Sequence, residues 1–329
     1  MKRTLAALGL LLLLLGTCTR HTPKIEPIED VLKLAYMDLP QSGIIHIALE
    51  KGFFTAEGLT VKALPFAFGK LALASVSRGE ADLSISPETP IVFSILAGEN
   101  LGIAAVIGTW DKNTVIIANK ASGVQKPSDL VGKTIGVTRG TTGEYFLETF
   151  LLVRGIKLDS VKIVDMQPAM MLEALLSDQI AAAATWTPIH FDISERLAEQ
   201  ALIFFGDDFY TEHLVISGTL TYMKKNPGAM KAFIRAIIRA EDFMKEYPDE
   251  AVVIIAEHSN LSRSSVRATL ELLRGRVSLD QSLLLQLEDE TRWALRLPIY
   301  AGQSMPNWLN YLHMDALDSV APDRVRVIR

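Results

Sequence analysis

Four short segments contain residue types that suit the binding of a small polar molecule. They are Asp38–Gly43, Ser86–Thr89, Arg139–Tyr145 and Thr185–Pro188, and each is rich in proline, glycine or hydroxyl residues. Hydroxyl and amide side chains supply hydrogen-bond donors and acceptors, and glycine leaves backbone N–H groups approachable. The chemistry that these segments indicate is recognition of a solute through hydrogen bonds.

The first two segments supply side chains of different kinds. Their candidate ligand-binding residues are Pro40, Gln41, Ser42, Ser86, Glu88 and Thr89. Ser86 suits the cap of a helix whose first turn holds Pro87 and Glu88. Glu88 either faces a ligand amine or complements the dipole of that helix.

The third segment suits an anion. Gly140, Thr141 and Thr142 lie at the predicted start of a helix, where backbone N–H groups attract negative charge. Thr141 and Glu144 have the spacing of a capping box, so the Glu144 carboxylate competes for one of these N–H groups.

Two aromatic residues complete the candidate binding set. Tyr145 follows the third segment's glycines, and Trp186 ends the strand before the fourth segment's proline. Either ring could stack on a flat ligand. Each segment also has a structural interpretation, because a hydroxyl before a helix is usually a cap. Together, the four segments favour one shared ligand cleft.

The spacing of the histidines, carboxylates and hydroxyl residues in the sequence matches no catalytic or metal-binding pattern. The six histidines are scattered, and none has metal-ligand spacing such as HExxH. No Ser-His-Asp or paired-carboxylate arrangement can be assembled from the sequence order. We therefore expect a protein without a cofactor, without a metal and without enzymatic activity.

The elements that must position these segments alternate between strands and helices. Strands are expected at 31–37, 59–64, 81–86, 103–108, 114–118, 134–137, 161–165 and 181–185, and helices at 43–53, 70–77, 87–97, 142–153 and 170–177. From Asn226 onward, helices are expected at 227–246, 249–257, 262–273, 279–295 and 306–317. This pattern predicts an α/β fold with doubly wound sheets and a helical C-terminal tail. Ligands bind beyond the carboxyl ends of such strands, where the four segments lie.

The N-terminus has the pattern of a bacterial lipoprotein signal peptide over residues 1–18. Lys2 and Arg3 precede the apolar run Leu5–Leu15, which is too short to span a bilayer. The single cysteine, Cys18, is the expected lipidation site, and residues 19–30 are an expected tether. Thr17 departs from the usual residue before that cysteine, which leaves an ordinary cleaved signal peptide or an uncleaved anchor as alternatives.

Composition limits the class of partner. The chain has 329 residues, of which 49% are hydrophobic, so it can form two lobes with substantial cores. Its formal net charge is −5, and no basic run is present. This acidic balance argues against nucleic acid as a partner.

Several further stretches carry a family resemblance. Ile47–Phe54, Glu57–Leu59, Gly79–Asp82, Pro127–Val137 and Ala183–Pro188, in this order and spacing, resemble the nitrate/sulfonate/taurine-type solute-binding proteins of ABC transporters. These are relatives of the thiamine-precursor-binding group, with the type 2 periplasmic binding protein fold. The resemblance covers roughly residues 33–255.

The resemblance implies two α/β lobes joined by two hinge strands. Lobe one would comprise 31–116 plus 219–329, and lobe two 117–218, with crossings near 116–119 and 216–220. In sulfonate-binding relatives, the segment resembling Gly140–Tyr145 holds the acidic head group. The segments resembling Pro40–Ser42 and Ser86–Thr89 complete the pocket from the other lobe.

The implied function is that of an extracytoplasmic solute-binding lipoprotein. It would be a monomer, lipid-anchored in the periplasm or at the outer face of the cytoplasmic membrane, that delivers a solute to an ABC permease and its ATPase. A sulfonate- or taurine-like ligand would place its acid at Thr141 and Thr142 and its amine at Glu88.

Other functions remain open from the sequence. One is the binding of a thiamine-pyrimidine precursor, and another is that of a related biosynthetic enzyme. The enzymes need a histidine in the first segment, where this chain has Gln41 and Ser42. A third is an orphan sensory binding protein without its own transporter.

Overall fold

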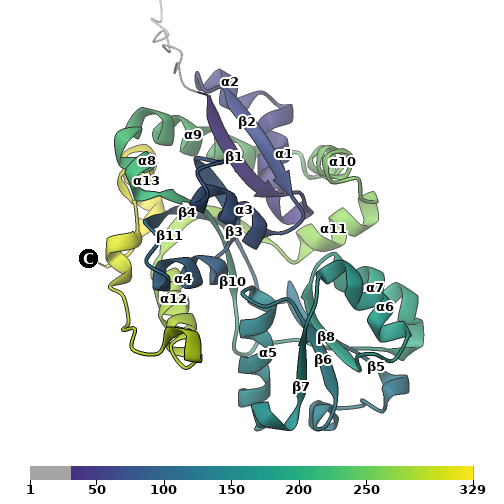
Figure 1. Cartoon of the computed structure of the whole chain (residues 1–329). Coiled ribbons are helices and arrows are strands. Elements are labelled where there is room, and N and C mark those ends of the chain that lie inside the picture. Colours follow the sequence, from purple (N-terminus) through teal and green to yellow (C-terminus); the bar gives the residue numbers. More distant parts are fainter. Residues whose placement is uncertain (1–30, 329) are drawn as a thin grey trace, which may run out of the picture.

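The computed structural model of the protein describes residues 31–328 (Figure 1). The expected signal peptide, the lipidation site Cys18 and the tether lie outside these residues. Within residues 31–328, no helix combines the length and apolar character needed to cross a membrane.

A seven-stranded mixed sheet organises lobe one. Its strand order is β12 (Val325–Arg326), β11 (Arg274–Asp280), β4 (Leu101–Trp110), β10 (Glu212–Thr219), β3 (Leu83–Pro87), β1 (Leu32–Met37) and β2 (Val61–Phe66). Strand β1 runs parallel to β2 and β3, whereas β10 runs antiparallel to β3 and β4. The carboxyl ends of β1 and β3 therefore meet at one edge of this sheet.

A five-stranded mixed sheet organises lobe two. Its strand order is β7 (Lys162–Asp165), β6 (Thr134–Val137), β8 (Ala182–Trp186), β5 (Thr114–Asn119) and β9 (Ala201–Phe204). Strand β6 is parallel to β7 and β8, and β5 is antiparallel to β8 and β9. Every residue of β5 and β8 is buried, which explains their nearly continuous apolar sequences.

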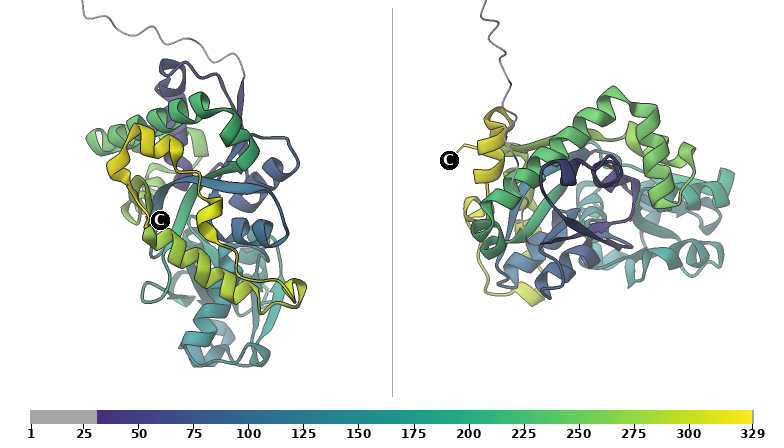
Figure 2. Two further views of the ribbon diagram at one scale, coloured as in Figure 1. Left: turned by 90° about the vertical axis from the view of Figure 1, so that its left-hand side faces the viewer. Right: turned by 90° about the horizontal axis from the view of Figure 1, so that it is seen from above.

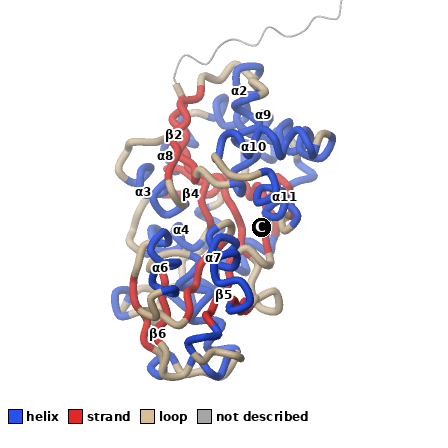
Figure 3. The backbone as a smooth tube through the Cα atoms, turned by 90° about the vertical axis from the view of Figure 1, so that its right-hand side faces the viewer, coloured by secondary structure: helices blue, strands red, loops and turns tan. Residues whose placement is uncertain are grey.

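Helices cover both sheets, as the blue and red tube of Figure 3 shows. Lobe one has α1 (Gly43–Glu50), α2 (Phe53–Ala56), α3 (Gly69–Ser77), α4 (Thr89–Leu96), α8 (Leu220–Lys225), α9 (Pro227–Glu246), α10 (Pro248–Ser259), α11 (Arg263–Glu271), α12 (Gln281–Ala294) and α13 (Asp315–Val320). Lobe two has α5 (Thr142–Val153), α6 (Met171–Leu176) and α7 (Ile189–Leu197). The α/β fold class with a helical C-terminal region is confirmed.

The longest helix, α9, shows how the sequence sets the packing. Pro227 begins it and Pro248 begins the next helix, in the first-turn position where proline needs no N–H partner. Met230, Phe233 and Ile237 recur at helical spacing and are fully buried. The Phe233 ring stacks on Phe54 of α2, with centroids 5.3 Å apart. Burial of each such side chain stabilises the fold by about 1.5–3 kcal/mol.

The chain passes between the lobes at residues 111–113 and 205–211, because β4 and β10 belong to the first sheet and β5 and β9 to the second. The crossings expected near 116–119 and 216–220 are therefore displaced. Residues 212–218, expected in lobe two, form β10 within the first sheet. Both flanking strands of each crossing are apolar, so the sequence does not reveal which sheet each one joins.

Three other expected elements differ in the structure. The helix expected over 43–53 is divided at Gly52, whose φ of 64° ends α1 before α2 begins. The helix expected over 279–295 begins only after strand β11. The helix expected over 306–317 is a 3₁₀ turn, Trp308–Tyr311, followed by α13. Figure 2 shows this C-terminal part (yellow) lying against lobe one.

Candidate binding site

A small cavity lies between the two lobes. It is lined by Met37, Gln41, Phe68, Gly69, Lys70, Pro87, Pro90, Asn113, Thr141, Thr142, Trp186 and Glu212. These residues come from strand ends and helix starts of both lobes and, through Asn113, from the first crossing. The cavity volume is about 20 Å³, which is room for roughly one water molecule. The lobes are therefore closed on each other.

A buried amide links the lobes beside this cavity. The Nε2 of Gln41 donates to the Oδ1 of Asn113 (2.9 Å) and to the main-chain O and Oγ1 of Thr187 (2.6 and 2.8 Å). Gln41 belongs to lobe one, Asn113 to a crossing and Thr187 to lobe two. These hydrogen bonds therefore hold the closed arrangement at its hinge.

The same network continues to a buried carboxyl group. Glu212, which begins β10, is 2% exposed. It accepts from the Nδ2 of Asn113 at 3.0 and 2.9 Å and from the Oγ1 of Thr114 at 2.6 Å. Burial raises the pKa of Glu212, and the bonds from Thr114 and Asn113 partly oppose this rise.

Two aromatic rings meet across the lobes. Phe68 precedes α3 in lobe one, and Trp186 ends β8 in lobe two. Their centroids are 6.1 Å apart, with an angle of 49° between the rings. A flat ligand could stack between them only if the lobes first separated.

The carboxylate of Glu144 lies at the start of α5, where a ligand anion was expected to bind. The Glu144 carboxylate accepts from the N–H of Gly140 (2.7 Å) and pairs with Arg139. Glu144 thus takes up one backbone N–H near the helix start, as expected. The capping box expected from the spacing of Thr141 and Glu144 does not form, because the Oγ1 of Thr141 donates to the main-chain O of Thr138 (2.6 Å) and does not cap α5. Thr141 and Thr142 still line the cavity, and the first-turn N–H groups of a helix lack partners inside the helix.

Lys70 brings a cation to the cavity. Its Nζ donates across the lobes to the main-chain O of Arg139 (2.7 Å). Lys70 also lines an open groove of about 780 Å³ that includes Arg139 and Gly140, so it lies between the cavity and this groove. The preceding Gly69 permits the close approach of α3 to β3, because a Cβ there would lie 2.4 Å from the Pro87 ring.

Glu88 lies inside lobe one, and the expectation that it faces a ligand amine is not supported. It is fully buried and does not line the cavity. Its oxygens accept from the hydroxyl of Tyr210 (3.1 Å) and from the N–H of His213 (3.0 Å). Burial, followed by repulsion from Glu290 and Glu212, raises the pKa of Glu88 well above its usual range.

The other sequence-predicted residues divide into two groups. Gln41, Thr141, Thr142 and Trp186 line the cavity, and Gly140 lines the neighbouring groove. Pro40, Ser42, Ser86, Thr89 and Tyr145 are buried and do not line the cavity. The Tyr145 ring instead packs against Tyr210 and Trp293, at 5.4 and 5.3 Å between centroids. The role of all these residues in binding stays a prediction.

The sequence reasoning missed Phe68, Lys70, Asn113 and Glu212. The segment Phe68–Lys70 joins a strand end to a helix start through a glycine, which is the same signal that marked the other segments. Asn113 and Glu212 adjoin the two crossings and were missed because the crossings were expected elsewhere. Within residues 31–328, no group of three or more His, Cys, Asp or Glu is placed to hold a metal ion.

Comparison with known proteins relates the chain to binding proteins. A family model described as "NMT1/THI5 like" matches residues 39–251. A Brucella abortus (strain 2308) protein, named as a binding protein without a ligand, is 28% identical over 80% of this chain and 81% of its own. The formylaminopyrimidine-binding protein of Halalkalibacterium halodurans is 22% identical, over 76% and 77%. The taurine-binding periplasmic protein of Escherichia coli is 25% identical, over 64% and 65%.

The fold has close counterparts among solved structures. The periplasmic aliphatic sulphonate binding protein of Escherichia coli superposes with a TM-score of 0.73 at 17% sequence identity, covering 86% of this chain and 97% of its own.

Proposed function

The chain belongs to the NMT1/THI5-like family, and on this premise we propose that it is the solute-binding protein of an ABC importer. Its ligand is a small organic anion, of the sulfonate or carboxylate class, with an apolar body. This proposal rests on the composition of the inter-lobe cavity. In it, Lys70 and the start of α5 lie beside the rings of Phe68 and Trp186.

The ligand's acidic group interacts with Lys70 and with the N–H groups at Thr141 and Thr142. A charged donor and a helix start both favour an anion. The apolar body lies between Phe68 and Trp186. Polar groups elsewhere on the ligand meet Gln41, Asn113 and Glu212, which replaces the pairing with Glu88 expected from the sequence.

Ligand binding is coupled to lobe closure. An organic ligand does not fit the cavity of about 20 Å³, so the lobes must separate to admit it. Each lobe alone offers half of the binding contacts, and the ligand favours the closed state only by its greater affinity for that state. The permease and its ATPase then receive the ligand from the closed protein.

A second ligand class is an aminopyrimidine, as in thiamine-precursor binding. The facing rings of Phe68 and Trp186 favour a flat heterocycle, and the buried Glu212 could accept from an exocyclic amine. One sequence relative is named for binding formylaminopyrimidine.

Binding to a ligand panel tests these proposals. The full chain is titrated calorimetrically with alkanesulfonates, taurine, short carboxylates and aminopyrimidines. We expect binding by one anionic class that weakens as salt is added, because charge pairing is screened. Binding of pyrimidines alone would favour the second class. If no small solute binds, or if a ligand is chemically converted, the transport proposal is wrong.

The protein is further proposed to be exported, to be anchored through lipid on Cys18 and to act as a monomer. The proposals of export and of a lipid anchor rest on the N-terminal pattern of Lys2, Arg3, Leu5–Leu15 and Cys18. We expect cells to incorporate labelled fatty acid into the wild-type protein and not into Cys18→Ala. Labelling of both proteins, or of neither, would contradict the anchor.

A further inference from the structure

The inter-lobe cavity contains a carboxyl group that is hydrogen-bonded only by uncharged donors. Among the described residues that line this cavity, Glu212 is the only acid and Lys70 the only base. Glu212 accepts two hydrogen bonds from the Nδ2 of Asn113 and one from the Oγ1 of Thr114. Because Glu212 follows the second crossing and its donors lie at the end of the first, this carboxyl group joins the two crossings at the hinge.

The cations of the two crossings and of the adjoining sheet are paired with other carboxylates. Lys112 forms an ion pair with Asp207, at 3.2 Å between Nζ and Oδ2, and Arg274 forms one with Asp111. In the described part of the chain, Glu212 has no cationic partner within ion-pair distance. A negative charge on Glu212 is therefore not compensated by a neighbouring cation.

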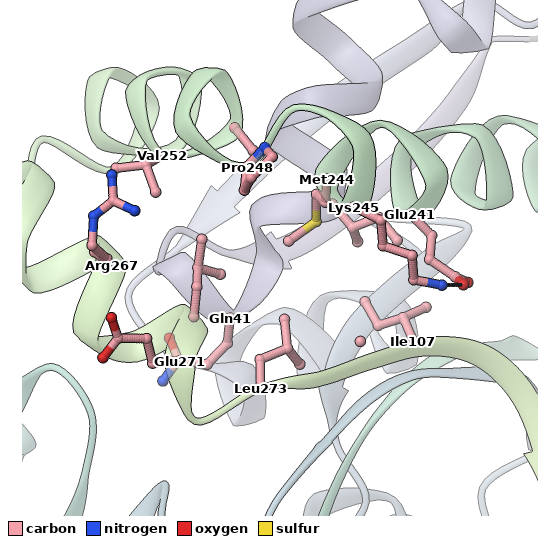
Figure 4. A pocket seen from close by; sticks show the side chains of 14 residues that line it. Gln41, Ile107, Glu241, Met244, Lys245, Pro248, Val252, Arg267, Glu271 and Leu273 are labelled. Atoms are coloured by element: carbon pink, nitrogen blue, oxygen red, sulfur yellow. Dashed lines mark hydrogen bonds and ion pairs between the residues drawn. The ribbon is translucent and has the colours of Figure 1, made fainter.

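The cations on the other side of the hinge network are also paired. The network ends at Gln41, whose amide lies at the edge of a separate pocket of about 410 Å³ in lobe one (Figure 4). Lys245 of that pocket forms an ion pair with Glu241, drawn as a dashed line in Figure 4, and Arg267 forms one with Asp249. These side chains do not compensate a negative charge in the inter-lobe cavity.

The titratable groups that face Glu212 from inside lobe one are acidic or uncharged. Glu88 and Glu290 are fully buried, and a charge on Glu212 repels a charge on either of them. Burial raises the pKa of Tyr210 and lowers the pKa of His213 to about 4, so neither side chain is charged near neutral pH. The surroundings of Glu212 thus disfavour its ionised form.

An anionic solute makes these surroundings still less favourable to a charge on Glu212. The Nζ of Lys70 donates to the main-chain O of Arg139 (2.7 Å), and an anion in the cavity would pair with this cation. While the lobes are apart, water can hydrate the Glu212 carboxylate. Closure removes this water, and the bound anion adds a like charge to the same cavity. Desolvation and a like charge each raise the pKa of a carboxyl group.

We propose that Glu212 takes up one proton from the solvent when the lobes close on an anionic solute, so that the protein binds the anion and a proton together. This inference rests on the proposed function. A protonated Glu212 keeps its place at the hinge, because its other oxygen still accepts from Asn113 and Thr114. The neutral group also favours anions over amines, since a ligand amine would pair with the ionised form.

Calorimetric titration at several pH values tests the proposal. The probes are ethanesulfonate and propionate, which stay ionised between pH 6 and pH 8.5, and the protein is the full chain. The pKa of Glu212 is higher in the complex than in the free protein, so the affinity should fall as pH rises between these two pKa values. The limit for one proton is about tenfold per pH unit.

Proton uptake is also measured directly. At the pH where the affinity falls most steeply, each titration is repeated in phosphate and in Tris buffer. These buffers release a proton with different heats, so the observed enthalpy of binding should differ between them in proportion to the protons taken up. We expect an uptake that approaches one proton per bound anion.

Variants assign the proton to Glu212. Glu212→Gln should remove both the pH dependence and the difference between buffers. Thr114→Val removes a hydrogen bond that lowers the pKa of Glu212, so the fall in affinity should move to higher pH; this variant tests the proposal if Glu212→Gln does not fold. Glu88→Gln changes a buried carboxyl group that does not line the cavity, and should keep the wild-type dependence.

The outcomes separate this inference from the proposed function. A probe that binds with the same affinity at every pH, or with the same enthalpy in both buffers, would overturn the inference and leave the proposed function intact. A full pH dependence in folded Glu212→Gln would do the same. If no anion binds at any pH, the proposed function is wrong and this inference is wrong with it.

Discussion

Trp186 tests the candidate site at the scale of one residue. Its ring is 6% exposed and meets Phe68 across the lobes. Trp186→Ala removes a desolvated aromatic contact, so we expect ligand affinity to fall by about 2 kcal/mol, as for central interface residues. Calorimetry with the ligand identified by the panel measures this loss. Tyr247→Ala, at an exposed ring between α9 and α10, is the control. Unchanged affinity in folded Trp186→Ala would exclude the ring from the site.

Lys70 tests the charge of the ligand. Lys70→Met removes the cation that lines the cavity, so an anionic ligand should lose about 1.5–3 kcal/mol of binding, as for a hydrogen bond to a charged group. A neutral ligand of similar shape should lose much less. Lys62→Met, at an exposed position of β2, is the matched control. Equal losses for anionic and neutral ligands would mean that Lys70 acts only by bonding Arg139.

Single site residues were predictable where they lie in a segment rich in proline, glycine or hydroxyl residues between a strand and a helix. Gln41, Thr141 and Trp186 lie at strand ends or helix starts, and the structure places them at the cavity. Glu88 has the same local signal, yet its side chain enters the lobe interior. Strand order decides which side of a helix start faces the partner lobe. Strand order is a tertiary property, so the local sequence does not reveal it.

Three elements of lobe one share a cluster of buried carboxyl groups. Glu88 precedes α4, Glu290 lies on α12 and Glu212 begins β10, and each is at most 2% exposed. Glu290 accepts from the Nε2 of Gln286 (3.0 Å), and its repulsion contributes to the raised pKa of Glu88. Burial is the main cause that raises the pKa of Glu290, from 4.5 to about 8. The folded protein therefore retains a proton here that an unfolded chain has already released.

This cluster predicts a pH-dependent stability. Between about pH 5 and pH 8 the folded state binds more protons than the unfolded state, so the free energy of unfolding decreases as pH rises. The slope approaches about 1.4 kcal/mol per pH unit for one proton. Glu290→Gln mimics the protonated group and should flatten this dependence.

Urea unfolding at pH 5.5 and pH 8.5 measures the pH effect. Glu288→Gln, on the same helix but paired with Arg292 at the surface, should keep the wild-type dependence. A wild-type protein equally stable at both pH values, or a Glu290→Gln variant that retains the full dependence, would contradict the assignment.

Elements were predictable where the sequence carries a strong local pattern. The expected bounds of β6, α5 and α9 agree with the structure. Strand β11 was missed because Arg274, Gly275 and Arg276 interrupt its apolar pattern. It pairs with β4, from far earlier in the chain, and so depends on a partner that local patterns do not reveal.

The proposed binding of an organic solute requires the whole molecule to adopt two arrangements. The closed cavity holds about 20 Å³, so an organic ligand enters only after the lobes move apart about the crossings at 111–113 and 205–211. We expect small-angle scattering to give a larger radius of gyration without ligand than with saturating ligand. Identical curves in both conditions would contradict opening by lobe separation.

The two crossings also bear on the order in which the polypeptide folds. All strands of the lobe-two sheet come from one continuous stretch of chain, from β5 to β9. In lobe one, β4 pairs with β10 and β11, which come much later in the chain. Pairings between distant segments form slowly. During synthesis lobe two can therefore mature first, while the first sheet stays incomplete until almost the last strand has left the ribosome.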